Sequence, residues 1–88
     1  MILSNMSDLL TVTIRDRKGV VWQGEATVVS SINSVGPFDV LQNHANFISI
    51  IKTRLVVTKM DKTKQEFNVD SGVMQVRENK IMVYLGVK

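Results

Sequence analysis

The stretch Gly36-Pro37-Phe38-Asp39-Val40-Leu41-Gln42-Asn43-His44-Ala45-Asn46-Phe47-Ile48-Ser49-Ile50-Ile51 decides the fold of this chain. Its first two residues predict a chain reversal, because Pro37 presets its own φ and Gly36 accepts conformations closed to other residues. Two apolar runs follow, at residues 38–41 and 47–51, and both are rich in β-branched and aromatic side chains. We predict two buried strands, joined by an ordered polar loop at residues 42–46 that carries the only histidine, His44.

Outward from this stretch the hydrophobic period is two. Leu10, Val12 and Ile14 alternate with polar residues near the start of the chain, and Ile81 and Val83 do so near its end. Turn residues punctuate the chain at 16–19, 61–64, 71–72 and 78–79. A short break is expected at residues 52–54. Gly24 predicts a bulge or bend where a strand passes from one sheet to another.

Short strands separated by turn residues, with no helical period, are typical of a sandwich or barrel. We therefore predict an all-β fold, a flattened β-sandwich or barrel of roughly eight to ten short, mostly antiparallel strands. The 88 residues are enough for one domain. We place it at residues 9–88 and interpret residues 1–8 as an N-terminal extension.

Composition limits the classes of function that fit this chain. Hydrophobic residues make up 44% and charged residues 22%, which is close to globular averages and does not indicate disorder. The absence of cysteine excludes a disulfide framework and a thiolate metal site. No apolar run approaches the ~18 residues of a membrane span, and the N-terminus lacks the features of a secretory signal.

The search for reactive groups gives no catalytic constellation. His44 could bind zinc or act as a base, but it has no second histidine and no closely spaced carboxylate to complete a site. The serines lie outside any nucleophile elbow, and no glycine-rich loop enters a helix. We predict no catalytic residue, no metal ligand and no cofactor, and therefore a chain that is not itself an enzyme.

A nucleic-acid module is the alternative from another class. The net charge is +3, and five cations cluster in sequence: Lys52, Arg54, Lys59, Lys62 and Lys64. Small β-folds that bind single strands place exposed aromatic residues beside such a groove. Here the three phenylalanines fall on strand positions expected to be buried, which leaves Trp22 and Tyr84 as candidates for stacking.

The organising stretch also resembles a known family. The N-terminal β-sandwich of the epsilon subunit of rotary ATP synthases carries Gly-x-Phe-Gly-Val-Leu-Pro-Gly-His-Ala-Pro-Leu-Leu, and six residues match it: Gly36, Phe38, Val40, Leu41, His44 and Ala45. Residues 20–26 are similar to the family's strand of the form apolar-Phe-x-Gly-x-Ala. Residues 69–83 are similar to its Val-Ser-Gly-Gly-Phe-x-Glu-Val-x-x-Asn-x-Val-x-Val. The resemblance runs from about residue 10 to residue 85.

The resemblance implies a non-catalytic central-stalk subunit that couples the gamma subunit to the membrane c-ring during proton- or sodium-driven ATP synthesis. By position, the ring-facing residues would be Ser34, Val35, Pro37 and His44. The gamma-facing residues would be Asp16, Val21, Phe47, Ile48, Leu55 and Arg77. For the apolar members of that set, plain core packing is the alternative.

The resemblance also implies a place for the protein, at the cytoplasmic face of the bacterial inner membrane, held there as a peripheral part of the complex. The family's C-terminal helical hairpin has no counterpart in the four residues after position 84, so inhibition and nucleotide sensing are not expected of this chain. Nucleic acid is not expected as a partner under this interpretation.

Overall fold

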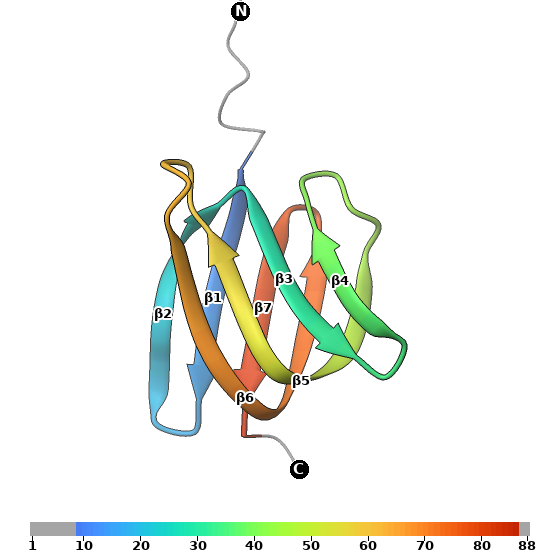
Figure 1. The fold of residues 1–88 in the computed structure, drawn as a ribbon. Helices are drawn as coiled ribbons and strands as arrows, with labels where there is room; N and C mark the ends of the chain where they lie inside the picture. Colours follow the sequence, from blue (N-terminus) through green and yellow to red (C-terminus); the bar gives the residue numbers. More distant parts are fainter. Residues whose placement is uncertain (1–8, 87–88) are drawn as a thin grey trace, which may run out of the picture.

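A computed structural model describes residues 9–86 (Figure 1). Within that range the chain forms strands and no helix. The strands are β1 (Leu10–Asp16), β2 (Gly19–Ala26), β3 (Val28–Asn33), β4 (Gly36–Val40), β5 (Phe47–Thr58), β6 (Lys64–Arg77) and β7 (Lys80–Leu85). The expected extension at residues 1–8 lies outside the described residues, as do residues 87 and 88.

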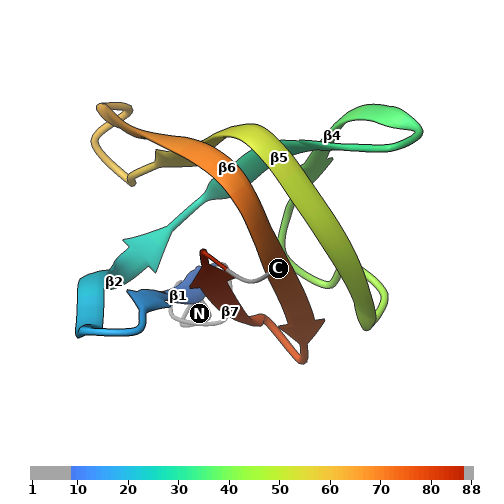
Figure 2. The same cartoon turned by 90° about the horizontal axis from the view of Figure 1, so that it is seen from below.

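The strands form one sheet in the order β2-β1-β7-β6-β5-β3-β4. The β1–β7 pair is parallel and the other pairs are antiparallel. This sheet folds over on itself into two facing layers, as the view from below shows (Figure 2). The back layer holds β2, β1, β7, the second half of β6 and the first half of β5. The front layer holds the other halves of β5 and β6, with β3 and β4. The all-β sandwich class is confirmed.

The described residues hold seven strands, fewer than the eight to ten expected. The difference arises because two predicted breaks, at residues 52–54 and 71–72, lie inside strands. The register of β5 against β6 shifts between Ile51 and Thr53. At this bulge Thr53 has a φ of 74°, a strained value for a β-branched residue that costs about 1–3 kcal/mol. The bulge bends the continuous strand from one layer into the other.

Glycines mark close approaches rather than the breaks expected of them. A Cβ on Gly72 would lie 2.9 Å from the backbone oxygen of Tyr84, so β6 needs glycine where it bends past β7. Gly24 pairs regularly with Val12, and the indole of Trp22 covers it. The predicted bulge at Gly24 is therefore wrong. The chain instead changes layer at Thr27, between β2 and β3.

The chain reversal predicted at Gly36 and Pro37 differs in its details. The chain reverses at residues 34–35, where the Asn33 side chain accepts hydrogen bonds from the backbone N–H groups of Val35 (2.9 Å) and Gly36 (3.2 Å). Pro37 lies inside β4 and pairs with Ile32. Because β4 is an edge strand, a proline there removes no necessary ladder hydrogen bond. The polar loop at 42–46 and the two-residue turn at 78–79 are confirmed.

The core lies between the two layers and is built by strand alternation. It contains Leu10, Val12, Ile14, Ala26, Val29, Val40, Ile51, Leu55, Val57, Val69, Met74, Val76, Ile81 and Val83. Leu55 is 0% exposed. It was placed among the gamma-facing residues, and that placement is wrong, because a side chain with no exposed surface has nothing to offer a partner.

Candidate functional site

The loop at residues 41–46 is fixed to the β6–β7 turn by two hydrogen bonds. The backbone N–H of Asn43 donates to Oδ1 of Asn79 at 2.6 Å, and the N–H of Glu78 donates to Oδ1 of Asn46 at 2.9 Å. Glu78 and Asn79 both have positive φ, 50° and 66°, as a tight two-residue hairpin loop requires. The position of His44 is therefore set by a turn that follows more than thirty residues later.

His44 itself is exposed, and its contacts are local. Its Nδ1 lies 2.8 Å from the backbone oxygen of Ala45, and its ring centroid lies 4.9 Å from that of Phe47. Phe47 in turn packs edge-on against Phe38 at 5.9 Å. The imidazole thus lies tilted against Phe47, one member of an aromatic pair that packs against the core. Across residues 9–86, no group of three or more His, Cys, Asp or Glu side chains is placed to hold a metal ion.

The outer face of the back layer carries large apolar side chains. In one cross-strand row Tyr84 pairs with Val73 and Val73 with Ile50, and in the next row Met82 pairs with Gln75 and Gln75 with Ile48. Five of these six residues are apolar, with Gln75 between Met82 and Ile48, and we call the set the apolar face. Ile48 is 68% exposed, Ile50 71% and Tyr84 39%. Ser49, between the two isoleucines, is half-buried, and Ile51 and Val83 are buried. The two isoleucines therefore point away from the core.

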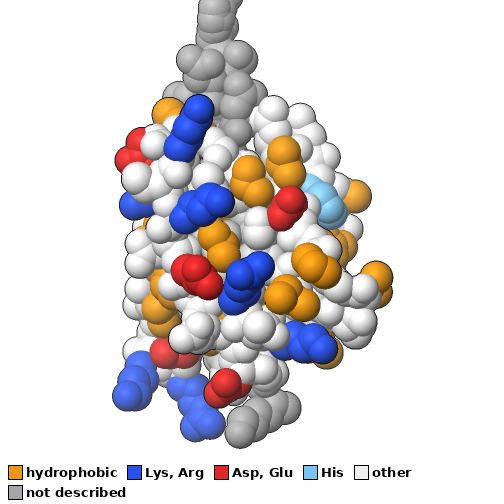
Figure 3. Space-filling model, in the orientation of Figure 1, with side chains coloured by type: hydrophobic (Ala, Val, Ile, Leu, Met, Phe, Trp, Pro, Cys, Tyr) orange, Lys and Arg blue, Asp and Glu red, His pale blue; other side chains and the backbone are white. Residues whose placement is uncertain are grey.

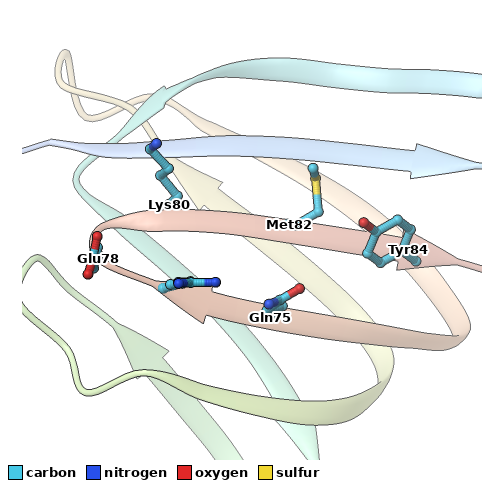
Figure 4. Close-up of a pocket in the computed structure, with 6 residues that line it drawn as sticks. Gln75, Glu78, Lys80, Met82 and Tyr84 are labelled. Atoms are coloured by element: carbon cyan, nitrogen blue, oxygen red, sulfur yellow. The ribbon is translucent and has the colours of Figure 1, made fainter.

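Three shallow depressions run across this face. The first, of about 450 Å³, is lined by Ser34, Ile48, Ser49, Ile50 and Lys52. The second, of about 370 Å³, shares Ile48 with the first and also touches Gln75 and Arg77. The third, of about 400 Å³, shares Gln75 and Arg77 and is completed by Glu78, Lys80, Met82 and Tyr84 (Figure 4). The shared residues join the depressions into one groove across β5, β6 and β7.

The structure brings some of the proposed gamma-facing residues together. Phe47, Ile48 and Arg77 all line the second depression. Val21 is the extra residue of the β1–β2 bulge and is exposed at the far edge of the same layer. Asp16 ends β1 at the turn into β2, where its side chain accepts a 2.8 Å hydrogen bond from the N–H of Lys18.

The four proposed ring-facing residues are divided between the two ends of β4. Ser34 and Val35 form the β3–β4 turn, and Val35 is 94% exposed. Pro37 follows at the start of β4 and is also exposed. The loop that carries His44 follows the other end of this strand (Figure 1). The imidazole lies beside Phe47. The imidazole is therefore grouped with the gamma-facing set rather than with Ser34 and Val35.

Sequence reasoning missed three residues of the groove, Ile50, Lys80 and Met82. It singled out two others, Lys52 and Tyr84, only as candidates for binding nucleic acid. Strand alternation carries a signal for three of these five, since Ile50 shares a face with Ile48, and Met82 and Tyr84 alternate with the core residues Ile81 and Val83. The sequence gives no sign that β5 and β7 belong to the same outer face.

The outer face of the front layer has a different character. A depression of about 310 Å³ there is lined by cations, Arg54 and Lys64, and by carboxylates, Asp39 and Glu66. Figure 3 shows Lys and Arg side chains interspersed with acidic and apolar ones over this face. Within residues 9–86, Tyr84 is the one exposed side chain among phenylalanine, tryptophan and tyrosine, and it lies on the other layer. Tyr84, the exposed candidate for stacking on bases, therefore lies on a different surface from Arg54 and Lys64.

A comparison with known protein families establishes which family this chain belongs to. The family described as "ATP synthase, Delta/Epsilon chain, beta-sandwich domain" matches residues 9–85. The chain belongs to this family. Its similarity to the epsilon subunit, inferred from residues 36–51 and two further motifs, is thereby confirmed. ATP synthase is an enzyme complex associated with a membrane. Within residues 9–86 no helix is long and apolar enough to cross one.

Curated relatives and solved structures agree with this assignment. The ATP synthase epsilon chain of Campylobacter lari is 37% identical over 79 residues, which cover 89% of this chain and 61% of that relative. The epsilon chain of Sulfurimonas denitrificans is 31% identical over 75 residues, covering 84% of this chain and 58% of the relative. This chain therefore matches about three-fifths of the length of these relatives.

Two solved structures share the fold. A chain in the Euglena gracilis mitochondrial ATP synthase structure, which contains OSCP, F1 and the c-ring, superposes with a TM-score of 0.84 at 14% identity, over 93% of this chain and 53% of that one. A chain in the central stalk and c-ring structure from Tetrahymena thermophila gives a TM-score of 0.69 at 10% identity, over 86% of this chain and 62% of that one. At such low identity the agreement concerns the fold alone.

Proposed function

We propose that this protein is a non-catalytic central-stalk subunit that couples the gamma subunit to the c-ring during proton- or sodium-driven ATP synthesis. The observation that carries the proposal is the apolar face. Exposed isoleucines and a tyrosine gather on one layer of a domain whose family is that of ATP synthase epsilon chains. Contiguous exposed apolar surface of this kind marks a binding site, because leaving it in water is unfavourable.

The gamma subunit is the proposed partner of the apolar face. Asp16, Val21, Phe47, Ile48 and Arg77 would lie within or around this contact, and Leu55 is excluded by its burial. A stable complex buries more than ~1,000 Å² in total. That area requires more than one depression, so we expect the whole groove across β5, β6 and β7 to take part.

The c-ring is the proposed partner of the β3–β4 turn. Ser34, Val35 and Pro37 are exposed and meet the groove where Ser34 lines its first depression. His44 remains a proposed ring contact, at the opposite end of β4. A close-packed domain between the two partners would deform little under load, which suits the transmission of torque. No cofactor is required for this role.

This role would place the protein at the cytoplasmic face of the bacterial inner membrane, held by protein contacts. The bacterial origin of the relatives supports this placement. The proposed role is mechanical, and no reaction is assigned to residues of this chain.

The proposal is tested by capture of the purified gamma subunit on immobilised variants. Ile48→Asp places a charge where the first and second depressions of the groove meet and should abolish capture. His44→Glu places a charge beside the gamma-facing Phe47 and should weaken it. Met60→Asp is the matched control, because Met60 is 65% exposed but lies in the β5–β6 turn away from the groove. Circular dichroism should show that all variants keep the parental fold. Gamma capture by Ile48→Asp at the parental level would refute the assigned surface.

A further inference from the structure

Cations are distributed along the whole groove. Lys52 lines the first depression, Arg77 the second, and Arg77 with Lys80 the third. Arg77 and Lys80 are direct cross-strand partners on β6 and β7. Like charges that face each other across a ladder are destabilising, so this pair does not contribute to the stability of the isolated domain. The side chains of Arg77 and Lys80 form no hydrogen bond and no ion pair with any residue in the range 9–86.

Carboxylates are scarce in the groove itself, and the exposed Glu25 lies outside it on β2. Glu78 lies at one end of the third depression, and no other acidic residue lines the groove within the described part of the chain. On the front layer, by contrast, Arg54 and Lys64 share a depression with Asp39 and Glu66. The groove therefore combines an apolar floor with unpaired positive charge, a combination that the opposite face lacks.

The backbone of the sheet restricts what can lie in the groove. The groove crosses β5, β6 and β7, whose N–H and C=O groups are engaged in the β5–β6 and β6–β7 ladders. An extended segment lying across the strands would find no backbone partners, whereas a helix brings its own hydrogen bonds. Two inter-strand spacings amount to about 10 Å, which corresponds to roughly two helical turns.

We propose that the groove binds an amphipathic helix of the gamma subunit whose apolar stripe is flanked by carboxylates. This inference rests on the proposed function and specifies the chemistry of its partner. The apolar stripe packs on Ile48, Ile50 and Met82. The carboxylates pair with Lys52, Arg77 and Lys80, and so relieve the repulsion between Arg77 and Lys80. A second copy of this chain is disfavoured as the occupant, because a two-fold interface would bring the same cations face to face.

Association kinetics with purified gamma subunit test the charge complementarity. The double variant Arg77→Glu/Lys80→Glu should lower the association rate constant about tenfold or more at low salt, and should flatten its dependence on salt. The control Arg54→Glu/Lys64→Glu makes the same change in net charge on the front layer. It should leave the rate within about twofold of the parent. Equal effects of the two double variants would show a general field effect and overturn the proposal.

A carbodiimide crosslink identifies the partner group directly, since it joins a lysine amine to a carboxylate in contact with it. Lys80 should become linked to an Asp or Glu in a helical segment of the gamma subunit. Lys80→Arg keeps the charge but cannot form this amide, so it should bind as the parent does and lose the crosslink. Linkage of gamma through Lys64 alone would contradict the proposal.

The outcomes distinguish a failure of the proposed function from a failure of the acidic-helix proposal. If the unmodified protein does not capture gamma, the proposed function fails and this inference fails with it. If it does, and Ile48→Asp abolishes capture while Arg77→Glu/Lys80→Glu associates normally, the function stands and the acidic helix is refuted. Vesicles of anionic phospholipid test a lipid as the occupant instead. If the control Arg54→Glu/Lys64→Glu binds the vesicles, Arg77→Glu/Lys80→Glu does not, and both associate with gamma at the parental rate, the groove binds lipid and the proposal is refuted.

Discussion

The backbone N–H of Asn43 donates a hydrogen bond of 2.6 Å to the side-chain oxygen of Asn79, across 36 residues of sequence. The backbone oxygen of Asn79 also accepts from the N–H of Thr11 at 2.9 Å. One turn residue thus connects the His44 loop, the start of β1 and the β6–β7 hairpin. We infer that Asn79 holds the His44 loop against the back layer, next to the groove.

Substitution of Asn79 should release that loop without unfolding the domain. Asn79→Gly retains the positive φ but removes the acceptor, so we expect a loss of about 1 kcal/mol in the free energy of unfolding. Hydrogen exchange at the Asn43 amide should become faster. Asn79→Asp keeps the acceptor oxygen and should preserve slow exchange. Unchanged exchange in Asn79→Gly would mean that the hydrogen bond does not hold the loop.

Ser31 is predicted to stabilise the bend in β5. Its side chain is 3% exposed, and its hydroxyl donates a 2.7 Å hydrogen bond to the backbone oxygen of Arg54, beside the bulge. Ser31→Ala should lower the free energy of unfolding by about 1–3 kcal/mol, because it removes this hydrogen bond from a buried position. Ser30→Ala removes an exposed hydroxyl bonded to Asp39 and should change it by less than ~0.5 kcal/mol. Urea unfolding of the two variants measures the difference, and equal values would contradict this account.

The two glycines at close contacts should differ in their tolerance of alanine. Neither has a φ in the left-handed region, so a Cβ is opposed by its neighbours and not by the backbone conformation. Gly72→Ala forces the Tyr84 carbonyl away from 2.9 Å and should cost about 1–3 kcal/mol. Gly24→Ala meets the outer atoms of the half-buried Trp22 ring, which can move more easily, and should cost less. Thermal unfolding should rank the variants in this order, and the reverse order would be inconsistent with a rigid bend at Gly72.

Asp61 is predicted to titrate below its ordinary range. The hydroxyl and the backbone N–H of Thr63 donate to its Oδ1 at 2.6 and 3.0 Å, and these hydrogen bonds lower the pKa of Asp61 below its ordinary value of 3.8. Because the folded pKa is the lower one, the stabilising contribution is complete above pH 3.8 and is lost as the pH falls through the folded value. Thr63→Val should raise the pKa of Asp61, and Thr63→Ser should leave it low. NMR titration of the carboxylate measures both, and equal pKa values in the two variants would remove the hydroxyl as the cause.

Strand content and much of the core could be read from the amino-acid sequence. A period of two is a local property, so Val12, Ile14, Ile81 and Val83 could be placed in a core without knowledge of their neighbours. The turn at residues 78–79 was equally local, since only a few residue types accept positive φ. Continuous apolar runs were ambiguous. In residues 55–57 the period cannot tell the buried side from the exposed one. The gamma-facing assignment of Leu55 follows from its position in the family resemblance, and the local pattern offers no check on it.

The sequence by itself determined an all-β domain and its family, because both depend on short-range patterns of residue types. Only the tertiary structure decided that β5 and β6 bend through both layers, that Ile48 and Tyr84 share one outer face, and that His44 lies apart from Ser34. These relationships depend on which strands pair and where the register shifts. Strand pairing is determined by the free energy of closing two layers over a common core. Residues far apart in sequence contribute to that free energy together.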